Sequence, residues 1–134
     1  MKKYLMLYLA LILLVSAFAC SKDSGESDLV KFYFRGTIYL RGEPVEGVTV
    51  EMEYRDSSGQ SGVTWIAHNK DAVTDADGKY EFVLEKSVGV STTSSWTFRI
   101  RCLHPEIGSW TDWKLGGSAT RGESGAAVLN VNLE

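Results

Sequence analysis

Trp110 and Trp113 lie on either side of Asp112, and this pattern is the most suggestive of chemistry in the sequence. An indole ring has a broad apolar face that suits stacking on a sugar ring, and a carboxylate accepts hydrogen bonds from hydroxyl groups. The pattern therefore predicts a ligand-binding site at Trp110, Asp112 and Trp113. Three further aromatic residues would extend such a platform: Tyr33, Tyr39 and Trp65. The alternative is that both indoles cap the open end of a small hydrophobic core.

Residue types that perform catalysis or bind zinc are sparse. The two histidines, His68 and His104, are far apart in the sequence, and Cys102 is the one thiol near either of them. A zinc site needs three or four ligands, so we expect no zinc site and assign His104 to a loop. Cys102 continues the alternation of the apolar residues before it, which predicts a buried and poorly nucleophilic thiol. No Ser, His and Asp spacing indicates a triad, so we expect no enzyme activity and no cofactor.

Asp71, Asp75 and Asp77 are the remaining candidates for metal ligands, because calcium prefers carboxylate and carbonyl oxygens. The Asp-x-Asp-Gly sequence at residues 75–78 is, however, ordinary for a tight turn. The twelfth position of a loop that begins at Asp75 holds Lys86, where calcium loops carry Glu. The sequence therefore predicts a hairpin turn here and no metal site.

Cys20 is the candidate for a covalent modification. Two lysines follow Met1, and residues 4–18 form an apolar stretch of the length of an export signal, short for a membrane-spanning helix. The sequence Ala-Phe-Ala-Cys at residues 17–20 resembles the lipobox of bacterial lipoproteins. The resemblance implies cleavage of a signal peptide at 1–19 and attachment of palmitate-type acyl chains to Cys20. An uncut N-terminal membrane anchor is the alternative.

The residues after Cys20 predict where the protein resides. Residues 21–23, Ser-Lys-Asp, resemble the signals that send lipoproteins to the outer membrane, which implies a lipid-anchored envelope protein; exposure at the cell surface remains open. Residues 20–28 are polar, and we expect a flexible tether there. Without residues 1–19, 12 basic side chains remain against 17 acidic ones, a net charge of −5. Such a charge disfavours nucleic acid as a partner. A lipid on Cys20 would leave Cys102 without a disulfide partner.

The elements that must position these residues are strands. Apolar and polar residues alternate through most of the chain after residue 28, and no segment has helical periodicity. The strands that we expect cover residues 30–41, 48–55, 63–66, 72–74, 80–84, 96–102 and 127–133. Short strands separated by turns predict a single antiparallel β-sandwich of about seven strands at residues 29–134.

Three motifs resemble the carboxypeptidase regulatory-like domain, a transthyretin-like (prealbumin-like) sandwich related in architecture to Ig-like folds. They are Gly-Thr-Ile at residues 36–38, Gly-Glu-Pro-Val-Glu-Gly-Val-Thr-Val at 42–50, and Thr-Asp-Ala-Asp-Gly-Lys-Tyr-Glu-Phe at 74–82. The resemblance covers roughly residues 36–84. It implies a non-catalytic accessory module that assists folding, spacing or binding.

The sequence thus favours an envelope lipoprotein that binds a protein or glycan partner. A structural spacer or adhesin-type subunit is the first alternative. A hydrolase of transthyretin-like fold is another, although the C-terminal Tyr-Arg-Gly-Ser of that enzyme family is missing. A third alternative is an isopeptide bond from Lys31 to Asn130 or Asn132, assisted by Glu81; the outward parity of Lys31 and the two asparagines opposes it.

Overall fold

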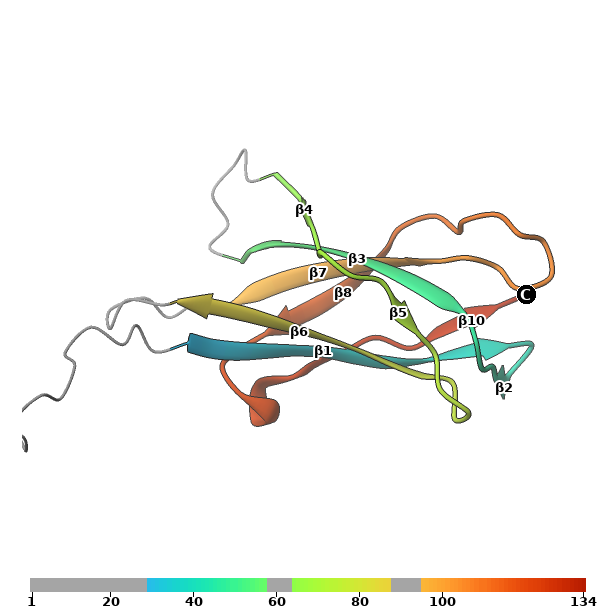
Figure 1. The fold of residues 1–134 in the computed structure, drawn as a ribbon, viewed down its shortest axis with the longest axis horizontal. Coiled ribbons are helices and arrows are strands. Elements are labelled where there is room, and N and C mark those ends of the chain that lie inside the picture. Colours follow the sequence, from blue (N-terminus) through green and yellow to red (C-terminus); the bar gives the residue numbers. More distant parts are fainter. Residues whose placement is uncertain (1–28, 58–63, 88–94) are drawn as a thin grey trace, which may run out of the picture.

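The protein folds into two β-sheets packed face to face, as a computed structural model shows (Figure 1). The structure describes residues 29–57, 64–87 and 95–134. Cys20, the predicted signal peptide and the predicted tether lie outside the described residues. In the part of the chain that is described, no helix has the length and apolar character needed to cross a membrane.

Strand β1 (Leu29–Leu40) is the centre of the first sheet. Its side chains alternate between buried and accessible, so one face contributes to the core while the other meets solvent. Strand β6 (Lys79–Ser87) pairs with it antiparallel, from Leu29 opposite Ser87 to Thr37 opposite Lys79. The short β2 (Glu43–Pro44) continues this side of the sheet through Tyr39.

The C-terminal strands pair with the other edge of β1 and run parallel to it. They are β9 (Ala127–Val128) and β10 (Val131–Leu133), separated by Leu129 and Asn130. The Tyr80 hydroxyl donates to the Leu129 carbonyl at 2.7 Å, and Asn130 Oδ1 accepts from the Thr37 amide at 2.9 Å. A Cβ at Gly36 would overlap with the Leu129 carbonyl and lie 2.7 Å from Tyr80 Oη. Glycine at this position therefore permits the close approach of the two segments.

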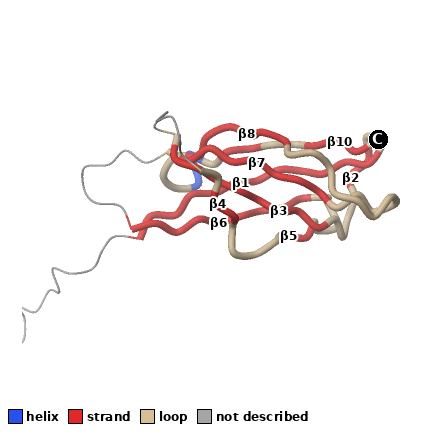
Figure 2. The backbone as a smooth tube through the Cα atoms, turned by 90° about the horizontal axis from the view of Figure 1, so that it is seen from above, coloured by secondary structure: helices blue, strands red, loops and turns tan. Residues whose placement is uncertain are grey.

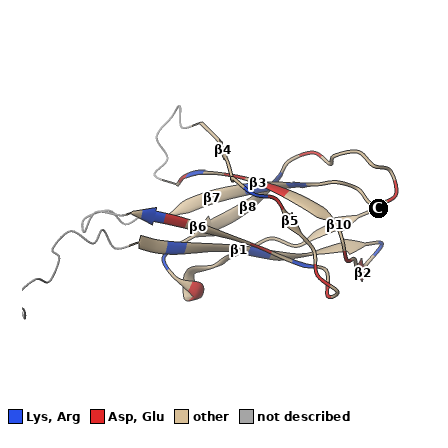
Figure 3. Cartoon of the chain, in the orientation of Figure 1, with Lys and Arg blue, Asp and Glu red and all other residues tan. Residues whose placement is uncertain are grey.

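The second sheet has the strand order β4-β3-β7-β8, and β5 also pairs with β3. These strands are β3 (Thr49–Asp56), β4 (Ile66–Ala67), β5 (Ala72–Val73), β7 (Trp96–Cys102) and β8 (Lys114–Ala119). Figure 2 shows the layers from above, with η1 (Glu123–Gly125), a single 3₁₀ turn, beside them. Both layers carry basic and acidic positions along their strands (Figure 3).

The hydrophobic core fills the space between the sheets. Phe34 of β1 and Phe98 of β7 meet across it with ring centroids 5.0 Å apart, and both side chains are fully buried. Cys102 is also fully buried, as the alternation predicted, and it is a free thiol. Because burial disfavours the thiolate, it raises the pKa of Cys102 to about 11. The thiol therefore behaves as a small apolar side chain of the core.

The predicted all-β sandwich is confirmed, but several strands differ from the expected ones. The short β2 was not predicted, and β4 lies at Ile66–Ala67 where a strand at residues 63–66 was expected. The expected last strand is divided into β9 and β10 at Leu129 and Asn130. The Leu129 amide still donates to the Arg35 carbonyl of β1, while the Leu129 carbonyl accepts from Tyr80 and the Asn130 side chain accepts from the Thr37 amide. Strand β8 was not predicted. Its sequence, Lys-Leu-Gly-Gly-Ser-Ala, has neither alternation nor β-branched residues, and Gly116 is present because the Phe98 ring fills the space beside it.

The adjacent glycines of β8 provide a test of this packing. A Cβ at Gly116 would collide with the Phe98 ring, whereas a Cβ at Gly117 has no neighbour within 4 Å. We expect Gly116→Ala to lower the free energy of unfolding by about 1–3 kcal/mol through overpacking. Gly117→Ala is the control and should leave stability unchanged or raise it by up to about 1 kcal/mol. Equal urea midpoints for the two variants would contradict the packing described here.

Candidate functional site

Trp110 and Trp113 lie on the outer face of the second sheet, in the segment that returns alongside β7. The chain turns after β7, and Leu103 and Trp110 then form an isolated antiparallel bridge. The Thr111 amide donates to the Cys102 carbonyl at 2.9 Å, and the Cys102 amide donates to Thr111 Oγ1 at 3.0 Å. These bonds fix the returning segment against the edge of β7, so both indoles are placed by the backbone.

Six side chains from four segments stack on this face as an alternating Arg–Trp ladder. Their order is Arg55, Trp65, Arg99, Trp113, Arg101 and Trp110. Each guanidinium carbon lies 4.4 to 4.9 Å from the centroid of the neighbouring indole ring. A cation over an aromatic face at this distance contributes about 0.5–1 kcal/mol at an exposed site. Five such contacts in series hold the tryptophans in fixed positions on the sheet.

Two glutamates on β3 orient the central arginines of the ladder. Glu53 is opposite Arg99 and Glu51 is opposite Arg101 in the β3–β7 register. Arg99 Nε donates to Glu53 Oε2 at 2.7 Å, and Arg101 Nε donates to Glu51 Oε2 at 2.5 Å. All four side chains are between 22% and 33% exposed, so these ion pairs are partly shielded from water. Directly opposite charge pairs stabilise an antiparallel sheet and here also aim the guanidinium planes.

The ladder leaves its tryptophans unequally accessible. Trp65 and Trp113 each stack on two guanidinium groups, whereas Trp110, at the end of the ladder, stacks on one among the described residues, that of Arg101. Trp110 is 37% exposed. Asp112 is exposed too, and its carboxylate has no hydrogen bond or ion pair with the described part of the chain. Trp110 therefore retains ring surface for a ligand, while the faces of Trp113 are occupied by arginine.

The tryptophan pair lies outside the hydrophobic core and is stacked with arginines, which neither interpretation of the sequence included. Neither indole belongs to the hydrophobic core, so the alternative that they cap the sandwich is wrong. Trp65 lies in the ladder, as the platform hypothesis expected, but Tyr33 and Tyr39 lie on β1 in the other sheet. The arginines of the ladder were not predicted as part of the site. Their outward parity on β3 and β7 was visible, but the return of residues 110–113 alongside β7 was not.

A hollow of about 270 Å³ adjoins the ladder on the side of β5. Trp113 and Arg101 form one wall, and Asp71 and His68 contribute from the β4–β5 connection. Glu51 and Glu53, which also line it, are engaged by the arginines. The outer face of the second sheet thus combines aromatic surface with hydrogen-bonding groups.

The histidines and the aspartate turn have structural partners. Buried His104 accepts at Nδ1 from the amides of Glu106 and Ile107, and its Nε2 lies 3.1 Å from the Glu134 carbonyl, where it donates. Asp75 Oδ1 accepts from the amides of Asp77 and Lys79 at 2.9 Å, which closes the predicted turn. Within residues 29–57, 64–87 and 95–134, no three His, Cys, Asp or Glu side chains form a group able to hold a metal ion.

The side chains of the isopeptide alternative are far apart, so that alternative is wrong. Lys31 forms an ion pair with Glu85 at 3.7 Å, whereas Asn130 binds the amide of Thr37, six residues further along β1. Asn132 Oδ1 accepts from the Gly42 amide at 2.9 Å, at the far end of the same strand. The two asparagines instead fasten the C-terminal strands to β1.

Comparison with known proteins informs the fold. No family model matches the chain, and no curated protein matches it in sequence. Among solved structures, the chain is similar to the dioxygenase domain of a dioxygenase–carbohydrate-binding fusion protein from the cellulolytic bacterium Streptomyces sp. SirexAA-E. The match has a TM-score of 0.50 at 13% identity and covers 83% of this chain and 84% of that one. At this identity the likeness shows a shared β-sandwich fold.

Replacing an arginine of the ladder by lysine tests the stacking separately from the charge. Arg99→Lys keeps the positive charge opposite Glu53 but removes the planar group that stacks on Trp65 and Trp113. We expect a loss of about 1–2 kcal/mol in the free energy of unfolding, measured by urea denaturation.

The control is Arg41→Lys. Arg41 also pairs with a glutamate, Glu106, but its side chain is 65% exposed and stacks on no aromatic ring among the described residues. An exposed pair contributes little, so we expect a change within about 0.5 kcal/mol. A loss at Arg99 no larger than at Arg41 would show that the ladder does not stabilise the sheet.

Proposed function

We propose that this protein is a non-catalytic module of the bacterial cell envelope, anchored by lipid on Cys20, which binds a glycan through Trp110. The observation that carries the binding proposal is the end of the Arg–Trp ladder. There one indole is fixed by Arg101 on one side, remains 37% exposed, and is followed two residues later by an exposed carboxylate at Asp112. A sugar ring has an apolar face and a hydroxyl-bearing edge. A rigid aromatic ring can stack on that face while a nearby free hydrogen-bond acceptor binds the hydroxyl groups at the edge.

Rigidity matters for affinity as well as for position. A flexible tryptophan would lose conformational freedom on binding, at a cost of roughly 0.5–1.5 kcal/mol for one ordered side chain. Trp110 has already lost that freedom, because Arg101 holds its ring and the Leu103 bridge holds its backbone. Arg101 is fixed in turn by Glu51 and Trp113. The entropic cost of ordering the Trp110 side chain is therefore met when the protein folds and is not charged against ligand binding.

The position of Trp110 along the molecule also favours contact with an external partner. Strand β1 begins at Leu29, directly after the predicted tether, and spans about 36 Å at ~3.3 Å per residue. At its other end Arg41 pairs with Glu106, in the turn that leads to Trp110. Figure 1 shows this turn and the C-terminus at the end of the domain opposite the start of β1. A chain anchored at Cys20 would direct Trp110 away from the membrane.

The resemblance to the carboxypeptidase regulatory-like domain supports an accessory role. Two glycines of those motifs have a structural role here: Gly36 admits Leu129 and Tyr80, and Gly78 closes its turn with a φ of 72°. The similar solved structure is the dioxygenase domain of its fusion protein, so that match concerns the fold and not the carbohydrate-binding part.

Trp110→Ala tests the glycan proposal. Native gels that contain xyloglucan, galactomannan or mixed-linkage β-glucan should retard the full-length protein in non-ionic detergent. Loss of the stacking surface should weaken retardation about tenfold or more. Tyr33→Ala is the matched control, since Tyr33 also lies under one guanidinium, that of Arg35 at 4.9 Å, but on the opposite sheet.

Two results would count against glycan binding. The first is a parent protein that no polysaccharide retards, and the second is Trp110→Ala retarded as strongly as the parent. If the parent instead assembles with itself as its concentration rises, a structural spacer becomes the better proposal.

Cys20→Ser tests the anchor independently. Several acyl chains hold a protein stably on a bilayer, whereas a serine accepts none by this route. We expect the parent in the membrane fraction with a mass increased by the lipid, and the variant unprocessed or released from the membrane. A parent without fatty acid, recovered with residues 1–19 attached, would contradict the proposal.

A further inference from the structure

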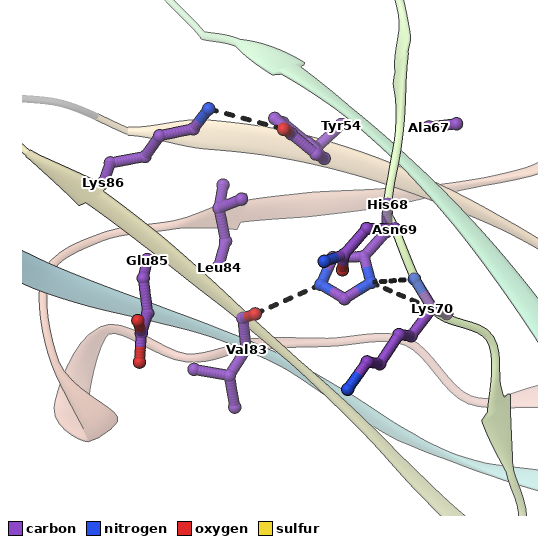
Figure 4. Close-up of a pocket in the computed structure, with 9 residues that line it drawn as sticks. All are labelled: Tyr54, Ala67, His68, Asn69, Lys70, Val83, Leu84, Glu85 and Lys86. Carbon is purple, nitrogen blue, oxygen red and sulfur yellow. Dashed lines mark hydrogen bonds between the residues drawn. The ribbon is translucent and has the colours of Figure 1, made fainter.

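We infer that a second site, at the end of the domain near the start of β1, binds a small ligand through its carboxylate. The site is a hollow of about 480 Å³ between β6 and residues 68–70, the connection from β4 to β5 (Figure 4). It is lined by residues 83–86 of β6 from the first sheet, and by Tyr54 and residues 67–70 from the second. It is separate from the surface around Trp110 and independent of the glycan proposal.

Lys86 is the group that suggests an anion. On β6 the residues Tyr80, Phe82 and Leu84 face the core, and Lys86 is the next residue with this parity. Its ammonium group lies 5.1 Å from the centre of the Tyr54 ring and 5.3 Å from that of Trp96. Its hydrogen-bond partner among the described residues is the Tyr54 hydroxyl, at 3.4 Å. An ammonium group has three protons to donate, so this one retains capacity for a ligand.

The opposite wall is held in place by His68. Its ring packs edge-on against Phe82, with centroids 5.2 Å apart, and its Nε2 lies 3.1 Å from the Val83 carbonyl oxygen. Its Nδ1 contacts the backbone of Lys70. Figure 4 shows the ring joining the connection to β6, with Asn69 and Lys70 on the same wall of the hollow. His68 is thus a positioning residue for an amide group and a second ammonium group.

The charges around the hollow are unbalanced. Neither Lys70 nor Lys86 has a carboxylate within ion-pair distance in the described part of the chain. Glu85 is the one acidic residue among the lining side chains, and it forms an ion pair with Lys31 on the neighbouring strand at 3.7 Å. The Lys86 ammonium group, the Tyr54 hydroxyl and the Asn69 amide therefore line a hollow whose one lining carboxylate, that of Glu85, is already paired. A ligand carboxylate would provide the missing acceptor atoms.

The size and lining of the hollow restrict the ligand further. Its volume is within the range of small-molecule pockets and accommodates a hexuronic acid or a smaller organic acid. Leu84, Val83 and Ala67 supply apolar surface between the polar groups. Inward-pointing charges also occur on edge strands as protection against aggregation, and that role alone would predict no ligand. Ligand binding and protection of an edge strand can be distinguished by measuring whether the hollow binds a carboxylate.

Calorimetric titration of the full-length protein in non-ionic detergent distinguishes them. Sodium galacturonate is the main probe, with sodium acetate and galactose as the two partial probes. We expect galacturonate to bind and galactose not to bind, with affinity falling as salt is added. Acetate binding as tightly as galacturonate would assign the site to a simple carboxylate, whereas weaker acetate binding would assign it to an acidic sugar. Galactose binding as tightly as galacturonate, or no heat from either acid at millimolar concentration, would overturn the inference.

Variants locate the binding in this hollow. Lys86→Met should weaken galacturonate binding at least tenfold. Lys86→Arg keeps the positive charge and should retain most of the binding, and it provides the test if the methionine variant is unstable. Tyr54→Phe removes only the hydroxyl and should weaken binding several-fold. The control is Lys79→Met, in the same strand but on its exposed outer face. Unchanged binding by Lys86→Met, or an equal loss in Lys79→Met, would overturn the assignment. Trp110→Ala should have no effect, so the two binding proposals fail separately.

Discussion

The guanidinium groups of Arg99 and Arg101 connect most of the features of the second sheet. Each forms an ion pair with the glutamate opposite it on β3 and is stacked against two indoles, one of them in both cases that of Trp113. These contacts join β3, β7, the segment before β4 and the return segment after β7. A guanidinium is suited to this position because its edges satisfy carboxylates while its faces satisfy aromatic rings. The exposed indole at Trp110 is a consequence of that order.

The sequence predicted the core of the fold well, because core residues repeat with a local period that the chain itself displays. The alternation in residues 30–41, 48–55 and 96–102 corresponds to β1, β3 and β7, and the Asp-Gly turn lies where the sequence places it. Strand β8 and the division between β9 and β10 were not predictable in this way. Both depend on contacts from far along the chain: the Phe98 ring beside Gly116, and Tyr80 beside Leu129.

The candidate site was predictable in part for the same reason. The Trp-x-x-Trp spacing marked residues 110–113 as unusual, but their neighbours follow from strand register, which one sequence does not display. Lys86 is instructive in another way. In the sequence it counted against a calcium loop, whereas the structure places its ammonium group between Tyr54 and Trp96 at the mouth of the sandwich. A charged residue at an inward position of a strand, such as Lys86 on β6, was therefore the better indication of a possible binding site.

The pairing of β1 has a mechanical consequence. Strand β1 is bonded to β6 from Leu29 to Thr37 on one side, and to β9 and β10 at positions between Phe34 and Leu40 on the other. The hydrogen bonds to antiparallel β6 are perpendicular to β1, and those to parallel β9 and β10 are slanted across it. A force along β1 therefore loads them together in shear rather than opening them one after another. A protein held at its N-terminal end and pulled by a partner bound at the far end experiences this direction of force. The topology therefore resists extension where a hairpin pulled from two adjacent ends would unzip.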